Sequence, residues 1–263
     1  MEEEKKSECS TCSNEPSGRI NVMRFVDRLD AYLRNNDLEG AKKHLEFWEN
    51  EARSMNDQCG LLTILNEEIG FSRRVNDRKM AADVLDEALN LLKEREQFDN
   101  TSGAIICVNI ATTLKAFDRS EEALAIYDKA ERVFLDRGME ESFEYASLLN
   151  NRSSALTQLQ RYDEAEEDIL KAYDILVNEG RHDAEIASSL IGLAHLVFER
   201  DEDYVRVEKT LDIAIEYLES EKQVHDANYA YTLEKIIPSL RYFKRNEIAD
   251  RYEKIVKEIY GKQ

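Results

Sequence analysis

Apolar residues in this chain recur in stripes with spacings of four, three and four residues. In residues 161–176, RYDEAEEDILKAYDIL, the stripe consists of Ala165, Ile169, Ala172 and Leu176. This spacing places the four side chains on one face of an α-helix. Two of the four are only alanine, which indicates that another backbone approaches this face closely.

The stripe occurs six times along the chain. It begins at Ala41, Ala81, Ala123, Ala165, Val207 and Ile248, so successive starts differ by 40, 42, 42, 42 and 41 residues. A second helical segment lies between the stripes and has recurrent small residues of its own. These are Ala104, Ala146, Ala187 and Ala230, which differ by 42, 41 and 43 residues. A regular period of this length predicts a repeat protein in which each unit is a pair of helices.

Short polar segments separate the two helices of a unit. They read RNND at 34–37, VNDR at 75–78, FDRS at 117–120 and ERDED at 199–203. We expect their Asn, Asp and Ser side chains to cap the following helix at its free amide groups. Because the linkers are short, neighbouring helices should be antiparallel. Ala165 and Ala172 are then predicted to face the partner helix of their own unit and the next unit.

Two segments resemble the second helix of the tetratricopeptide repeat family, in which alanine, a large residue and alanine follow one another. They are EEALAIYDKA at 121–130 and DEAEEDILKA at 163–172. The usual unit of that family has about 34 residues. The longer period here is similar to the kinesin light chain subclass, as are YASLLNNRSSAL at 145–156, RHDAEIASSLIGLA at 181–194 and VHDANYAYTL at 224–233. The resemblance covers roughly residues 20–261 and implies an all-α, right-handed α-solenoid of about six antiparallel helix pairs.

The expected organisation is a disordered, acidic and polar tail at 1–18 followed by the solenoid at 19–263. Its approximate units are 20–58, 59–99, 100–140, 141–180, 181–223 and 224–263. The end units depart from the pattern, since Trp48 replaces an alanine and Pro238 should kink its helix. Arg152 stands where the resemblance has leucine.

Composition agrees with an all-helical protein, because only nine residues are glycine and two are proline. The formal net charge is −19, from 55 acidic and 36 basic residues. Such a field repels nucleic acid and attracts basic partners, so we expect no nucleic-acid partner. The sequence has neither an apolar run of about 18 residues nor an apolar N-terminal segment. These features predict a soluble, cytoplasmic protein without a membrane partner.

Motifs for catalysis or cofactor binding are few. Cys9 and Cys12 form a CxxC pair, which is half of a zinc site, but no second pair or nearby histidine completes it. We therefore expect no metal and interpret the four cysteines as thiols. The sequence has no nucleophile with an assigned base, no paired metal spacing and no glycine-rich phosphate loop. It therefore predicts a protein that is not an enzyme and needs no cofactor.

Two histidines occur in similar surroundings, RHDA and VHDA. His182 and His225 directly precede Asp183 and Asp226, which we expect to cap the following helices. The histidines would then lie in surface turns, one full repeat apart.

The concave face of stacked helix pairs is the best candidate site, because the first helix of each pair lines it. Five residues after the recurrent alanine, the sequence has Asn109, Asn151 and Gly192. In the resembled family an asparagine here often hydrogen-bonds the backbone of an extended peptide. Asparagine suits this role because it both donates and accepts. Asn109 and Asn151 are interpreted as neighbouring peptide clamps. The alternative, that they are polar residues tolerated on a solvated face, stays open.

Other polar side chains should lie near these asparagines: Asn150, Lys115, Ser154 and His195. The sequence thus predicts a noncatalytic scaffold or adaptor that binds a protein or an extended peptide, with a basic partner as one option. A peptide-responsive bacterial regulator of the tetratricopeptide type is an alternative, although no helix-turn-helix segment is evident. An accessory subunit of an enzyme is another. The pattern does not indicate an oligomeric state.

Overall fold

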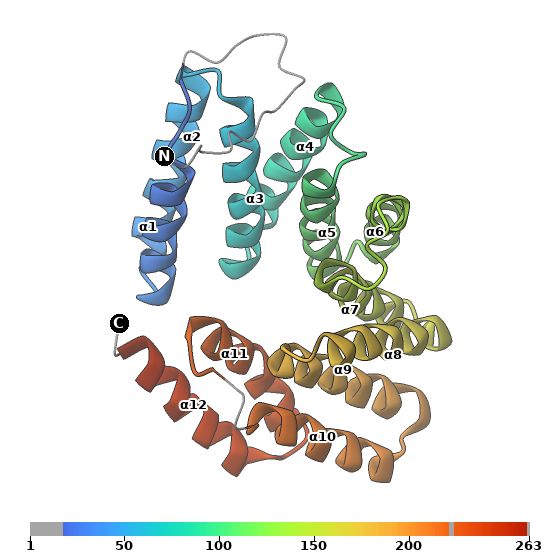
Figure 1. The fold of residues 1–263 in the computed structure, drawn as a ribbon. Helices are drawn as coiled ribbons and strands as arrows, with labels where there is room; N and C mark the ends of the chain where they lie inside the picture. Colours follow the sequence, from blue (N-terminus) through green and yellow to red (C-terminus); the bar gives the residue numbers. More distant parts are fainter. Residues whose placement is uncertain (1–17, 221–223, 262–263) are drawn as a thin grey trace, which may run out of the picture. The chain divides into compact units, whose positions relative to one another are not determined.

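The protein is described here by a computed structural model that covers residues 18–220 and 224–261. Within these residues every regular element is an α-helix, which confirms the predicted fold class (Figure 1). The helices are α1 (Val22–Arg34), α2 (Leu38–Ser54), α3 (Gln58–Arg74), α4 (Arg78–Glu94), α5 (Thr101–Ala116), α6 (Ser120–Asp136), α7 (Phe143–Gln158), α8 (Tyr162–Glu179), α9 (Asp183–Asp201), α10 (Tyr204–Leu218), α11 (Ala227–Tyr242) and α12 (Asn246–Gly261).

The helices fall into two compact units, Met1–Phe117 and Asp118–Gln263. In the second unit, α7 packs on α8, α9 on α10 and α11 on α12, so consecutive helices form pairs. Helix α9 also packs against α7 and α11, so the first helices of these pairs lie side by side. In the first unit, α1 packs on α2 and α3 on α4, while α3 also contacts α5. Each unit thus repeats the same arrangement of helix pairs.

The predicted stripes supply most of the core of both units. The stripe predicted to start at Ile248 is wrong by one residue, because the buried residues of α12 are Ala249, Tyr252 and Val256. All four stripe residues of α4, α6, α8 and α10 are buried, and Ala165 and Ala172 are fully inaccessible. The small residues of the first helices are equally inaccessible: Ala104, Ala146, Ala187 and Ala230. Alanine at these positions lets adjacent helices approach closely while still removing apolar surface from water.

A residue with positive φ ends the first helix of each pair. These residues are Asn36, Asn76, Asp118, Gln160, Glu202 and Lys244. After Asn76 they follow one another at intervals of 42 residues. The amide of the next residue often bonds a carbonyl five positions back, as Arg161 N does with Leu156 O at 2.9 Å. This αL ending stops the helix and turns the chain toward its partner.

The predicted caps are right in three of the four turns. The carboxylates of Asp37, Asp77 and Asp203 accept from amides of the first turns of α2, α4 and α10. The FDRS turn differs, because Arg119 occupies the cap position of α6 and its side chain makes no capping bond. Ser120 instead donates to Gln158 Oε1 at 2.5 Å. Ser120 is the first residue of α6 and not its cap residue, so its hydroxyl does not take the capping role.

Of the two caps expected at the His-Asp sequences, one is observed and one is not. Asp226 caps α11 by accepting from Tyr229 N at 2.9 Å. Asp183 does not cap α9, because the cap position belongs to His182, which makes no side-chain cap bond. The His182 ring instead stacks on Phe143 with centroids 4.7 Å apart, and its Nε2 lies 2.6 Å from Glu179 Oε2. The His182 side chain is thus engaged with Phe143 of α7 and Glu179 of α8 at this turn.

Candidate functional site: a polar groove along α7, α9 and α11

A groove of about 790 Å³ runs along the side-by-side helices of the second unit. Its walls come mainly from α7, α9 and α11, with Ile169 and Leu176 of α8 below. The lining is dominated by short hydroxyl and amide side chains: Ser147, Asn150, Asn151, Ser153, Ser154, Thr157, Ser188, Ser189, Asn228, Thr232 and Ser239. Such groups offer hydrogen bonds without demanding a charged ligand.

Two adjacent asparagines of α7 lie in this groove. Asn150 Nδ2 donates to Ser189 Oγ of α9 at 2.7 Å, while its Oδ1 is buried and has no partner among the described residues. Asn151 Nδ2 donates to the carbonyl of Ser147, one turn back, at 2.8 Å. A buried acceptor without a donor is costly. The Asn150 amide is therefore held in the α7 wall with an acceptor that no donor of the described residues satisfies.

His195 of α9 lines the same groove. Its Nε2 lies 2.9 Å from Ser239 Oγ of α11, which ties the two helices together. Burial lowers the pKa of His195 from its ordinary value. The imidazole is therefore neutral at pH 7 and acts as a hydrogen-bonding group in the groove. On the same helix, Gly192 occupies the position corresponding to Asn151. A Cβ built there would lie 3.9 Å from Ile169 Cδ1, so the groove is open down to α8 at this point.

The structure brings together four of the six predicted site residues. Asn150, Asn151, Ser154 and His195 all line the groove. Asn109 and Lys115 lie on α5, in the first compact unit. There Asn109 Nδ2 donates to Asn66 Oδ1 at 2.8 Å, and its carbonyl accepts from Arg73. Their predicted role in peptide binding stays a prediction.

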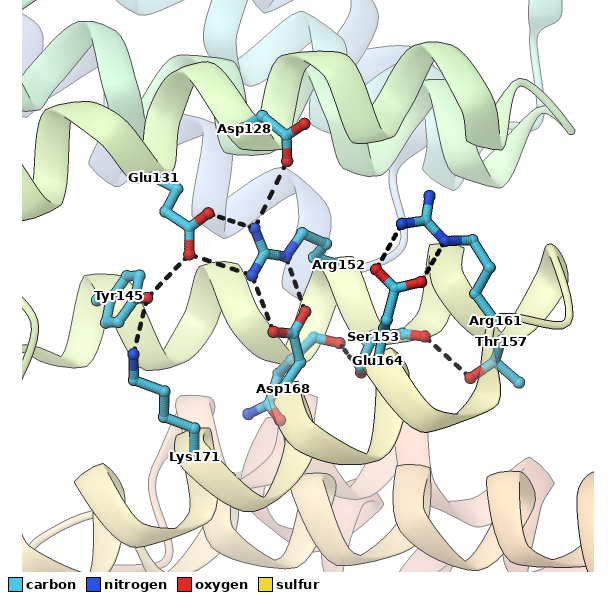
Figure 2. A network of polar contacts seen from close by, with 11 residues as sticks. Asp128, Glu131, Tyr145, Arg152, Ser153, Thr157, Arg161, Glu164, Asp168 and Lys171 are labelled. Carbon is cyan, nitrogen blue, oxygen red and sulfur yellow. Dashed lines mark hydrogen bonds and ion pairs between the residues drawn. The ribbon is translucent and has the colours of Figure 1, made fainter.

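A second polar cluster centres on Arg152, the residue that stands in place of leucine (Figure 2). Its guanidinium joins three helices. It donates to Asp168 of α8 at 2.8 and 2.9 Å and to Glu131 of α6 at 2.6 and 3.1 Å. Tyr145 donates to the same Glu131 and accepts from Lys171. Burial opposes the charge of Arg152, but the bonds to Asp168 and Glu131 outweigh it and raise the pKa of the guanidinium.

Every charge at the centre of this cluster has a partner, and the Arg152 side chain is only 14% exposed. The cluster therefore has the character of a structural ion network rather than a reactive site. Sequence reasoning missed it because its members lie on three helices, 16 and 21 residues from Arg152. The one indication in the sequence was Arg152 itself, an arginine where leucine was expected.

The described residues contain no group of three or more His, Cys, Asp or Glu side chains arranged to hold a metal ion. Cys9 and Cys12 lie outside the described part of the chain. Neither Cys59 nor Cys107 forms a disulfide, in agreement with their interpretation as thiols. None of the described helices is both long and apolar enough to cross a membrane.

The paired helices and the groove on their first helices define an α-helical repeat protein. The tetratricopeptide repeat family matches residues 146–175, which correspond to the α7 and α8 pair. No curated protein sequence matches the chain.

Two solved structures share the fold. BtubC (BKLC) from P. vanneervenii has 18% sequence identity and a TM-score of 0.56, covering 87% of this chain and 92% of that chain. TPR-like repeats described as those of a kinesin light chain from Podosopora anserina have 12% identity and a TM-score of 0.52, covering 75% and 94%. At these identities the likeness concerns the fold. It confirms the resemblance to repeats of the kinesin light chain type. Repeat folds of this type commonly serve as scaffolds for protein interactions.

Proposed function

We propose that the protein is a noncatalytic scaffold that binds an extended protein segment in the groove of α7, α9 and α11. The observation that carries this proposal is the groove lining itself, a row of hydroxyl and amide groups contributed by three neighbouring first helices. An extended peptide has a free N–H and C=O at each residue, so it complements such a wall along its length. Groups already engaged within the protein, such as Asn151 Nδ2, still leave their oxygens as acceptors.

The first test identifies a partner by pull-down with the full chain and titrates it against an Asn150→Ala/Asn151→Ala variant. Each lost hydrogen bond should cost about 1 kcal/mol, and more if a ligand amide is left buried. Together the two replacements should weaken binding roughly tenfold to a hundredfold. Asn109→Ala, tested separately, shows whether α5 contributes to the same interaction.

Asn178→Ala is the matched control, because Asn178 is an exposed asparagine of α8 outside the groove lining. Melting curves verify that each variant is folded. A double variant that melts like the wild type and binds with unchanged affinity would show that the groove asparagines do not contact the partner.

A further inference from the structure

An aromatic cluster lies where α9 and α11 end and α10 begins. We define it as His195, Phe198, Tyr204, Tyr242 and Phe243. Phe198 is its centre, with ring centroids 5.6 Å from Tyr204, 5.7 Å from Tyr242 and 5.8 Å from Phe243. All three contacts are edge-to-face, with interplanar angles of 78°, 88° and 82°. An edge-to-face contact leaves a ring face of one partner available to other groups.

Part of this cluster is open to solvent. Tyr204 is 63% exposed and Tyr242 is 57% exposed, and the neighbouring Val205 is exposed as well. Single exposed apolar residues are ordinary, but several adjoining aromatic rings are typical of interaction surfaces. The core of the second unit does not need these ring faces, because it is already filled by the buried stripes.

The aromatic cluster adjoins the groove through His195. This histidine lines the groove, and its ring lies 5.4 Å from Tyr242 and 4.7 Å from Phe243 between centroids. Glu199, one turn further along α9, also lines the groove. A protein segment in the groove would therefore meet the aromatic rings and a carboxylate where it passes His195.

The electrostatic surroundings of the aromatic cluster favour a cation. The nearby arginines are neutralised by carboxylates: Arg200 and Arg206 by Glu166 and Asp201, Arg241 by Asp250 and Glu253, and Arg245 by Glu208 and Asp212. Among the described lysines and arginines of the flanking segments 195–206 and 238–246, only Lys244 has no ion pair. Lys235 of α11 also lines the groove, where its Nζ lies 4.0 Å from the centroid of the Tyr231 ring. His195 is neutral at pH 7, so it does not repel a positive group, and the chain as a whole carries −19.

We propose that the aromatic cluster binds an arginine or lysine side chain of the protein segment that occupies the groove. This inference rests on the proposed function and adds a preference for a basic residue at one place. A cation over the face of an aromatic ring is attracted by the ring quadrupole, and Glu199 adds a charge of opposite sign. A neutral apolar side chain would gain only the burial of its surface.

The test uses a small probe, so that it does not depend on an unidentified partner. Acetyl-arginine amide and acetyl-citrulline amide have nearly the same shape, but only the first is charged. Each is titrated into the full chain while NMR signals of the His195 ring are followed. We expect saturable shifts with the arginine probe and an affinity at least about threefold above that of the citrulline probe, as one exposed cation–π contact provides.

The preference should disappear in a Tyr204→Leu/Tyr242→Leu variant. It should persist in Phe47→Leu, which changes an exposed aromatic residue of the other compact unit. Equal affinity of the wild type for the two probes, or no shift with either, overturns the inference. The two proposals can fail separately. If the wild type prefers the arginine probe but the Asn150 and Asn151 replacements leave partner binding unchanged, the cation site stands and the groove proposal is refuted.

Discussion

Two charged residues with little exposure occupy corresponding positions of the repeat but have different electrostatic environments. Glu68 of α3 and Arg152 of α7 are 84 residues apart, two periods of the repeat. Arg152 is surrounded by carboxylates that bind it. Glu68 is 5% exposed, and its acidic neighbours Glu49 and Glu87 are themselves bound by Arg53. Burial, followed by the charges of Glu49 and Glu87, raises the pKa of Glu68 to about 8.

Arg152→Leu is expected to destabilise the second unit by about 3–5 kcal/mol, because Glu131 and Asp168 would be left partly buried without their cation. Arg161→Leu is the matched control. Arg161 also binds a carboxylate, Glu164, but its side chain is 44% exposed, so the loss should be below about 1 kcal/mol. Urea denaturation measures both. Equal losses for the two variants would contradict a structural role for the buried network.

Glu68→Gln should raise stability at pH 7–8 and change little near pH 4. In the unfolded chain a glutamate ionises near pH ~4.3, whereas folded Glu68 holds its proton up to pH about 8. The wild type therefore loses stability between these values, by at most about 1.4 kcal/mol per pH unit from this residue. Asp83→Asn, at an exposed position of α4, should leave the slope intact. Free energies of unfolding measured from pH 4 to 8 test this prediction. If their dependence on pH is the same in Glu68→Gln as in the wild type, the raised pKa of Glu68 is refuted.

At the scale of helices, the endings of the first helices are the most regular feature of the fold. Three of these αL positions are Asn or Asp, which adopt positive φ at low cost. Gln160, Glu202 and Lys244 are not favoured there, yet they keep the 42-residue spacing. The surrounding helix pairs therefore impose the turn, and local preference contributes less.

Gln160→Gly should stabilise the protein by about 0.5–1 kcal/mol, since glycine adopts the φ of +59° without steric strain. Asn76→Gly, at φ +53°, is the comparison and should gain less, because asparagine tolerates this conformation. Thermal melts report both changes. A loss of stability in Gln160→Gly would mean that the Gln160 side chain makes a contact that matters more than backbone strain.

The sequence predicted the helix pairs because the information is local and repeated. Stripes such as Ala165 to Leu176 indicate which face of a helix is buried, and similar stripes recur along the chain. Asn150, Asn151, Ser154 and His195 were placed near one another for the same reason, since register along a repeat fixes which first-helix residues share a face. The partners of Arg152 and the raised pKa of Glu68 were not predictable, because they depend on which side chains meet across helices. The aromatic cluster likewise gathers residues from three helices without a common spacing.

At the scale of the molecule, charge and candidate function are separated in space. The chain carries −19, yet the groove is lined mostly by uncharged hydroxyl and amide groups. The boundary between the compact units falls after Phe117, in the turn between the two helices of the third pair. The described groove lies wholly in the unit that follows this boundary, so its geometry is set by α7 to α11 and their partners.

The hydroxyl-rich lining has a consequence for the direction in which a peptide would lie. Serine and threonine hydroxyls rotate, so each can donate to a carbonyl or accept from an amide. A wall of such groups satisfies a strand running from N-terminus to C-terminus as well as one running the opposite way. An asymmetric feature beside the groove, such as the ring faces next to His195, is then what selects one of the two orientations.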